Sequence, residues 1–151
     1  MTFSALMRDF GELAEIAPFE PDAYGVVKIN IDGVAVAFME RDAGTFVTWA
    51  EVGALPDEGG DRLCRRMMAE SLLGIATGGA ALTLDAETGK VMIHRTDPLE
   101  GLDLKGFVER LNSFLDERAK WEKALAGDFG ATESEKPDDG SLPLQDGMVF
   151  V

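Results

Sequence analysis

The chain has little of the chemistry that marks most metalloproteins and many enzymes. Among its 151 residues there is a single cysteine, Cys64, and a single histidine, His94. An internal disulfide and a multi-histidine metal site are therefore excluded. We expect Cys64 to be a small buried side chain of a helix. A Cys-His dyad would require two separate predicted elements to meet by chance packing, so we predict neither a metal nor a cofactor.

Basic residues are also few. The chain has 14 Lys and Arg against 28 Asp and Glu, a formal net charge of −14. A surface of this sign repels phosphate backbones and anionic lipids, so we expect neither nucleic acid nor membrane as a partner. The one local basic cluster comprises Arg62, Arg65 and Arg66, which we interpret as part of a salt-bridged helix at an interface.

Long apolar runs are missing as well. The sequence has no cationic start followed by an apolar segment, and no run of about 18 apolar residues that would span a bilayer. Its hydrophobic content of 46% nevertheless suffices for one buried core. We therefore expect a soluble, cytoplasmic protein with one compact domain.

Hydrophobic periodicity predicts the first half of the domain. A helical stripe is followed by Pro18 and Pro21, which we expect to end the helix. Alternating residues in 27–31 and 34–38 flank Asp32-Gly33, a pair typical of a two-residue hairpin turn. A second turn at 42–44 leads to a third strand, 46–52. The stripe of the helix consists of Phe3, Leu6, Met7, Phe10, Leu13 and Ala14.

The second half of the domain is predicted to contain two helices and two strands. A stripe of Leu63, Met67, Leu72 and Ile75 indicates a helix that Gly78-Gly79 would end. Strands at 82–84 and 91–93 pair across the turn at 85–90. A long helix then runs to Leu125, with Asp103 as its N-cap. The fold class is α+β: a five-stranded antiparallel sheet with three helices, in the order α-β-β-β-α-β-β-α.

The composition changes after this helix. Residues 127–151 are rich in Gly, Ser, Pro and acidic residues, and we expect an acidic flexible tail behind a domain of residues 1–126. The segment Met148–Val151 is strongly apolar. It has two interpretations of equal weight, a frayed end without a partner or a segment that docks on a sheet edge or groove.

This order of elements resembles that of the type III secretion chaperones of the CesT (Tir chaperone) family. The resemblance extends over about residues 3–126. Five passages carry it: the Asp-Gly hairpin in Ile29–Gly33, the Leu-Pro in Gly53–Pro56, the helical pattern Met68–Leu73, the glycine-to-strand passage Thr77–Asp85, and a last helix with Phe107, Phe114 and Trp121.

The resemblance implies a homodimeric, non-enzymatic protein that holds the N-terminal chaperone-binding segment of a secreted effector in extended form. Apolar grooves between the first helix and the sheet would take the client by edge pairing and side-chain insertion. The candidate client-binding residues are Phe3, Met7, Phe10, Val27, Ile29, Phe38 and Trp49. The candidate dimer residues are Leu63, Met67, Leu72 and Ile75.

Two other classes of function stay open. A module of the same fold could regulate secretion or transcription by capturing a protein other than an effector. A small enzyme could assemble a site from carboxylates that the sequence does not single out, although no nucleophile and base stand in a recognisable pattern.

Overall fold

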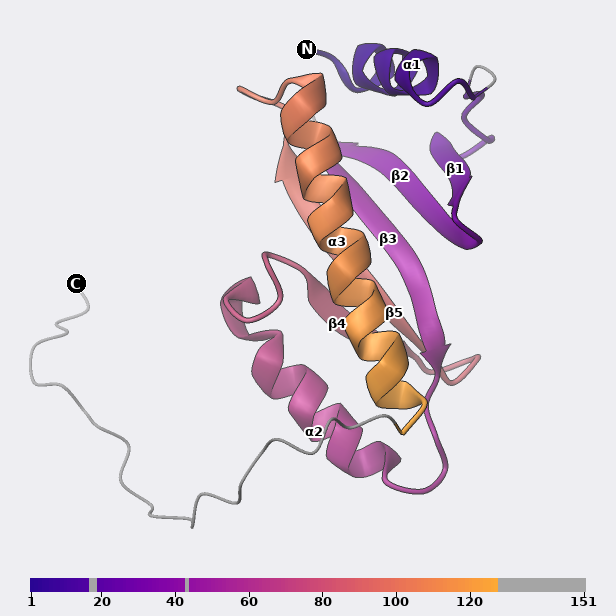
Figure 1. Cartoon of the computed structure of the whole chain (residues 1–151), viewed down its shortest axis with the longest axis vertical. Coiled ribbons are helices and arrows are strands. Elements are labelled where there is room, and N and C mark those ends of the chain that lie inside the picture. The colour runs from indigo at the N-terminus through magenta and orange to yellow at the C-terminus, as the bar shows by residue number, and fades with distance from the viewer. Residues whose placement is uncertain (17–18, 43, 128–151) are drawn as a thin grey trace, which may run out of the picture.

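The structure, a computed structural model, describes residues 1–16, 19–42 and 44–127. The predicted fold class and element order are confirmed (Figure 1). The elements are α1 (Phe3–Leu13), β1 (Val26–Ile31), β2 (Val34–Asp42), β3 (Thr45–Ala54), α2 (Gly60–Glu70), the short 3₁₀ helix η1 (Leu72–Gly74), β4 (Ala81–Asp85), β5 (Lys90–Pro98) and α3 (Leu104–Leu125). Apart from Gly127, the predicted tail and its apolar segment Met148–Val151 lie outside the described residues.

The sheet is antiparallel throughout, with the strand order β1-β2-β3-β5-β4. The predicted turn between β1 and β2 is confirmed, because Asp32 and Gly33 have φ values of +51° and +86°. Two successive positive φ angles match the twist of a two-residue hairpin. The turn fixes the register in which Ile29 lies opposite Val36 and Val27 opposite Phe38. These four side chains therefore share one face of the sheet.

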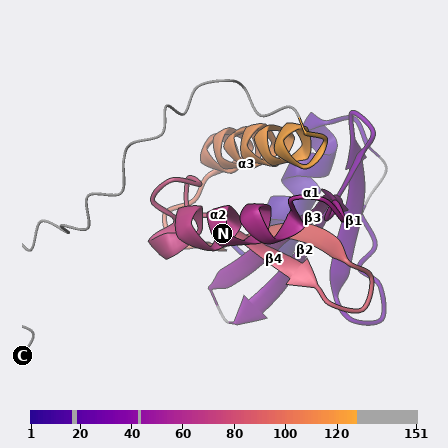
Figure 2. The ribbon, with the colours of Figure 1, turned by 90° about the horizontal axis from the view of Figure 1, so that it is seen from below.

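The two faces of the sheet differ in what covers them. Phe46, Thr48, Ala50 and Val52 of β3 are buried on the face covered by the helices. Figure 2 shows α1 and α3 on this side of the sheet. The intervening residues face the other way, and no described helix covers them. Trp49, which lies opposite His94 of β5, is half-buried on that face.

Aromatic rings join α3 to the rest of the core. The ring of Phe107 lies 5.1 Å from that of Phe10 on α1, 5.8 Å from Phe38 on β2 and 5.9 Å from Phe46 on β3, measured between ring centroids. All four side chains are buried. Phe107 therefore holds α1 against the sheet as well as α3.

The first helix ends at Leu13 with Ala14 as its C-cap, within one residue of the predicted stripe and before the two prolines. Glu15 adopts a left-handed φ of +54°, and the backbone N–H of Ile16 donates to the carbonyl of Gly11 at 3.0 Å. Phe19 then folds back on the helix, where its ring stacks 6.1 Å from Phe10. Gly11 allows this, because a Cβ there would lie 3.1 Å from the ring of Phe19.

The second helix is also shorter than the predicted stripe, since it ends at Glu70. The Oγ of Ser71 accepts a hydrogen bond at 3.0 Å from the backbone N–H of Leu82 in β4. The chain then turns so tightly that a Cβ on Gly74 would lie 2.7 Å from the Cα of Gly79. The first contact joins the end of α2 to β4 and the second closes a short turn, and the helix stops before Leu72 where they form.

We expect Phe107→Ala to lower the free energy of unfolding by about 3–5 kcal/mol, because it leaves a cavity that four elements surround. Leu13→Ala, on the exposed side of α1, should change it by less than about 0.5 kcal/mol. Urea unfolding followed by tryptophan fluorescence measures both values. An equal loss in the two variants would contradict the role given to Phe107.

Candidate protein-binding surfaces

Seven of the exposed large apolar side chains fall in two short stretches of the chain, and Met1 and Leu84 stand apart from them. The first is where α1 leads into β1: Leu13, Ile16 and Tyr24 all lie on this stretch, and Tyr24 is 85% exposed. We call these three residues, together with the outer edge of β1, the α1–β1 surface. Apolar groups grouped at one place on a surface are typical of an interaction site.

The outer edge of β1 is open to a further strand. β1 is an edge strand of the sheet. The backbone N–H of Val26 donates to Asp22 Oδ1 at 3.0 Å, and the carbonyl of Val26 accepts from the N–H of Asp22 at 2.9 Å. The backbone groups of Val26 thus point away from β2. Alternation along an antiparallel strand places those of Lys28 and Asn30 at the same edge, where no described strand pairs with them.

Asp22 closes the N-terminal end of this edge. Hydrogen bonds from the backbone N–H groups of Val26 and Tyr24 hold the pKa of the Asp22 carboxyl below its usual range. The carboxylate therefore stays ionised and holds the chain in place before β1. The open part of the edge begins after Val26.

The second surface lies where α2 ends. We call Met68, Leu72, Leu73 and Ile75 the α2–η1 surface; Leu73 is 85% and Ile75 81% exposed. Leu73 has a left-handed φ of +54°, a conformation that is unfavourable for a leucine. The surrounding turn enforces it, since the backbone N–H of Gly79 donates to the carbonyl of Gly74 at 2.8 Å. The turn thus holds apolar side chains outward.

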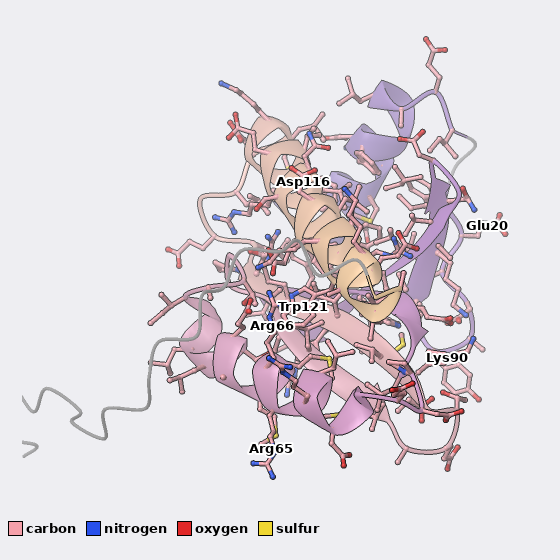
Figure 3. All side chains as sticks on the ribbon, turned by 60° about the horizontal axis from the view of Figure 1, so that its bottom comes forward. Glu20, Arg65, Arg66, Lys90, Asp116 and Trp121 are labelled. Carbon is pink, nitrogen blue, oxygen red and sulfur yellow. The ribbon has the colours of Figure 1, made fainter. Side chains whose placement is uncertain are left out.

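A buried tryptophan fixes α2 against α3. Trp121 is fully buried, and its Nε1 donates to Glu117 Oε1 at 2.9 Å. The guanidinium of Arg66 on α2 lies 5.2 Å from the centre of the Trp121 ring (Figure 3), a cation-π contact. Lys120 Nζ lies 5.7 Å from the same ring. Of the basic cluster predicted to form a salt-bridged helix at an interface, Arg66 does form a salt bridge, with its Nε 2.7 Å from Glu70 Oε1.

Glu70 links these cations. It accepts hydrogen bonds from Arg66 on α2 and, at 3.1 Å, from Lys120 on α3. Burial by itself would raise the pKa of Glu70, but the hydrogen bonds from Arg66 and Lys120 outweigh it and hold the pKa below its ordinary value. The same contacts raise the pKa of Lys120 despite its burial. α2 is thus fixed to α3 by ionised groups.

The chain matches the model of a known protein family. Residues 5–122 match the model of the Tir chaperone protein (CesT) family. The chain belongs to this family. A Chlamydia pneumoniae relative, CPj0713/CpB0740, is 32% identical over 119 residues, which cover 77% of this chain and 90% of the relative. The resemblance noted in the sequence is thereby confirmed.

Solved structures show the same fold. A chain of the ExsC-ExsE complex matches with a TM-score of 0.70 at 20% identity, covering 83% of this chain and 97% of that one. A chain of the HopA1-SchA chaperone-effector complex gives 0.66 at 20% identity, with 80% and 93% covered. The Yersinia pestis type III secretion chaperone SycH, in complex with a fragment of YscM2, gives 0.66 at 17% identity, with 79% and 98% covered.

The family fold buries most of the residues predicted to bind a client. Phe3, Met7, Phe10, Val27, Ile29 and Phe38 are core side chains. Trp49 is half-buried on the sheet face that the helices leave open. In contrast to these six residues, Leu13, Ile16 and Tyr24 are exposed. Among these three, only Leu13 belongs to the apolar stripe predicted for the first helix.

The residues predicted for a dimer are divided between core and surface. Leu63 and Met67 are buried beneath α2, whereas Leu72 and Ile75 are exposed. The structure adds Met68 and Leu73 to the exposed set. No periodicity could have found Leu73, because its exposure results from the left-handed turn after the helix.

The residues considered for a metal or catalytic site do not come together in the described part of the chain. No group of three or more His, Cys, Asp or Glu residues among them could hold a metal ion. Cys64 packs against the core under α2, while His94 lies on the opposite sheet face. Burial, and then the charge of Arg41, lower the pKa of His94.

None of the described helices has the length and apolar character to cross a bilayer.

We expect Glu70→Gln to lower the free energy of unfolding at pH 7 by about 0.5–1 kcal/mol. The contacts with Arg66 and Lys120 hold the folded pKa of Glu70 below its ordinary value, so its ion pairs stabilise the fold above the ordinary pKa and are lost as the pH falls through the folded one. The difference from the unsubstituted protein should therefore close in acid. Glu109→Gln, which removes an exposed pair 3.7 Å from Lys105, is the control and should have little effect at either pH. Urea unfolding at pH 7 and pH 3.5 measures both, and a pH-independent difference for Glu70→Gln would contradict this assignment.

Proposed function

We propose that this chain is a cytoplasmic, homodimeric chaperone that holds the N-terminal segment of a type III secretion effector in extended form. The open edge of β1 beside exposed apolar side chains is the observation that carries the proposal. Membership of the Tir chaperone family supports it, as does similarity to chains of complexes described as chaperone with effector.

We infer that the effector segment is held by backbone hydrogen bonds to the open edge of β1. The N–H and C=O groups of Lys28 and Asn30 offer a second extended chain the hydrogen bonds of a sixth strand. Exposed Leu13 and Ile16, in the stretch that leads into β1, offer apolar contact to the side chains of that strand. Backbone pairing is independent of sequence and keeps the bound segment extended, which is the form a chaperone for export has to preserve. It needs no covalent step, so we infer a non-enzymatic role.

We assign self-association to the α2–η1 surface. Its four apolar side chains are exposed to solvent, a costly arrangement that a second copy would relieve. Asp61, Arg62 and Arg65 lie exposed on the same helix. Because both signs are present, two identical faces can place opposite charges together. The dimer would thus leave the α1–β1 surface of each copy accessible.

Blocking the β1 edge should abolish client binding without unfolding the protein. Lys28→Pro removes an outward N–H at a position where an edge strand tolerates proline, while Lys28→Thr removes only the charge. We expect the tagged Thr variant, purified from its native cells, to retain an effector whose N-terminal segment resists proteolysis. The Pro variant should lose it. Mass spectrometry identifies the protected segment, and equal retention by both variants would contradict edge pairing.

Charged substitutions in the α2–η1 surface should separate the dimer. We expect Leu72→Glu with Ile75→Glu to give the mass of one chain in sedimentation equilibrium, because each dimer would bury four new charges. The same double change at exposed Leu13 and Ile16 is the control and should leave the mass of two chains. A dimeric Leu72→Glu/Ile75→Glu protein would remove the assignment.

A further inference from the structure

The charges around the two surfaces differ in a way that specifies the client more closely. We propose that the segment held at the α1–β1 surface is basic as well as apolar: an extended stretch in which Lys or Arg residues stand among the apolar ones. This inference rests on the proposed function and adds the chemistry of the partner.

The first observation is a long stretch without cations. From Asp9 to Val27 the sequence contains no Lys, Arg or His. This stretch includes the end of α1 and the whole passage into β1, and so all three exposed apolar side chains of the α1–β1 surface. Its carboxylates are Asp9, Glu12, Glu15, Glu20 and Asp22.

Three of these carboxylates have no ion-pair partner among the described residues. Asp9 lies 2.9 Å from Arg8, and Asp22 is bound by the backbone before β1. Glu12, Glu15 and Glu20 are exposed, and no salt bridge within the described part of the chain includes them. Figure 3 places Glu20 at the β1 margin of the molecule. They alternate along the chain with Leu13 and Ile16.

Nearby cations do not neutralise this group. Lys28, the one cation on β1, interacts with Asp22 and contributes to the lowered pKa of that carboxyl. Arg8 is engaged by Asp9. Other exposed carboxylates, such as Glu58 and Glu87, also lack a salt bridge among the described residues. The α1–β1 surface differs from the α2–η1 surface because no cation stands among its carboxylates from Asp9 to Val27, whereas Arg62 and Arg65 lie beside Asp61 on α2.

A segment with apolar and basic residues matches both the exposed apolar side chains and the unpaired carboxylates of this surface. Long Lys and Arg side chains can pack their aliphatic part against Leu13 and Ile16 while the charged end reaches a glutamate. A segment with carboxylates would instead bring like charges together, which disfavours the wrong partner. The α2–η1 surface, with Arg62 and Arg65 beside it, would repel a basic segment. Charge thus directs the client to the β1 edge.

The test uses three synthetic twelve-residue peptides with the same alternating Val, Ile and Leu residues. The intervening positions are Lys in one, Gln in the second and Glu in the third. Fluorescence anisotropy with the full chain at 50 mM salt should show the Lys peptide binding about tenfold tighter than the Glu peptide, with the Gln peptide between them. At 500 mM salt the difference should shrink, because screening shortens the range of exposed charges.

Two triple variants with the same change in net charge locate the effect. Glu12→Gln, Glu15→Gln and Glu20→Gln together should reduce the advantage of the Lys peptide at least about threefold. Glu58→Gln, Glu87→Gln and Asp116→Asn change three exposed carboxylates on other elements: before α2, between β4 and β5, and on α3, where Figure 3 labels Asp116. None of the three is in a salt bridge within the described residues. This control variant should retain the advantage.

The outcomes separate the inference from the proposed function. Equal affinities for the Lys and Glu peptides, or an equal loss in both triple variants, would overturn the basic client while edge pairing stands, provided that Lys28→Pro weakens all three peptides and Lys28→Thr does not. If Lys28→Pro leaves binding unchanged, or if no peptide binds, edge pairing itself is overturned and the inference with it.

Discussion

The packing of α3 along the sheet is the constraint on which both binding surfaces depend. Phe107 near the start of this helix contacts rings from α1, β2 and β3, and Trp121 near its end contacts Arg66 of α2. One helix thus positions α1 at one of its ends and α2 at the other, as Figure 1 shows. The two exposed apolar surfaces therefore lie on different parts of the domain, and the proposed client and the proposed second copy need not compete.

The strands could be predicted because their determinants are local. Alternation in residues 27–31 and 34–38 and the pair Asp32-Gly33 specify a hairpin whose register follows from the turn. The helical stripe of α1 was equally visible. What the stripe does not reveal is which of its apolar side chains a neighbour covers. Phe10 lies beneath Phe107 and Phe19, residues far from it in sequence or outside the pattern, so a predicted client contact became a core contact.

The end of α2 shows the same limit more sharply. Periodicity continues through Leu72 and Ile75, but the helix stops at Glu70 because of the bond from Leu82 to Ser71 and the approach of Gly74 to Gly79. The bond from Leu82 joins the helix end to a strand eleven residues on, a contact that periodicity does not reveal, and the two glycines close a short turn beside it. Their consequence is exposure: side chains that would have continued the buried stripe are turned toward solvent.

The charges of the two surfaces differ, and this difference indicates which surface is the better candidate for binding a second copy. Both surfaces are apolar, and either could in principle bind a second copy. At the α1–β1 surface, however, self-association would bring the unpaired carboxylates of Glu12, Glu15 and Glu20 together, at a cost that grows as water is excluded. The helix of the α2–η1 surface carries Asp61 together with Arg62 and Arg65, so two copies can match opposite signs. The distribution of charge therefore favours one surface for the dimer and leaves the other for a partner of opposite charge.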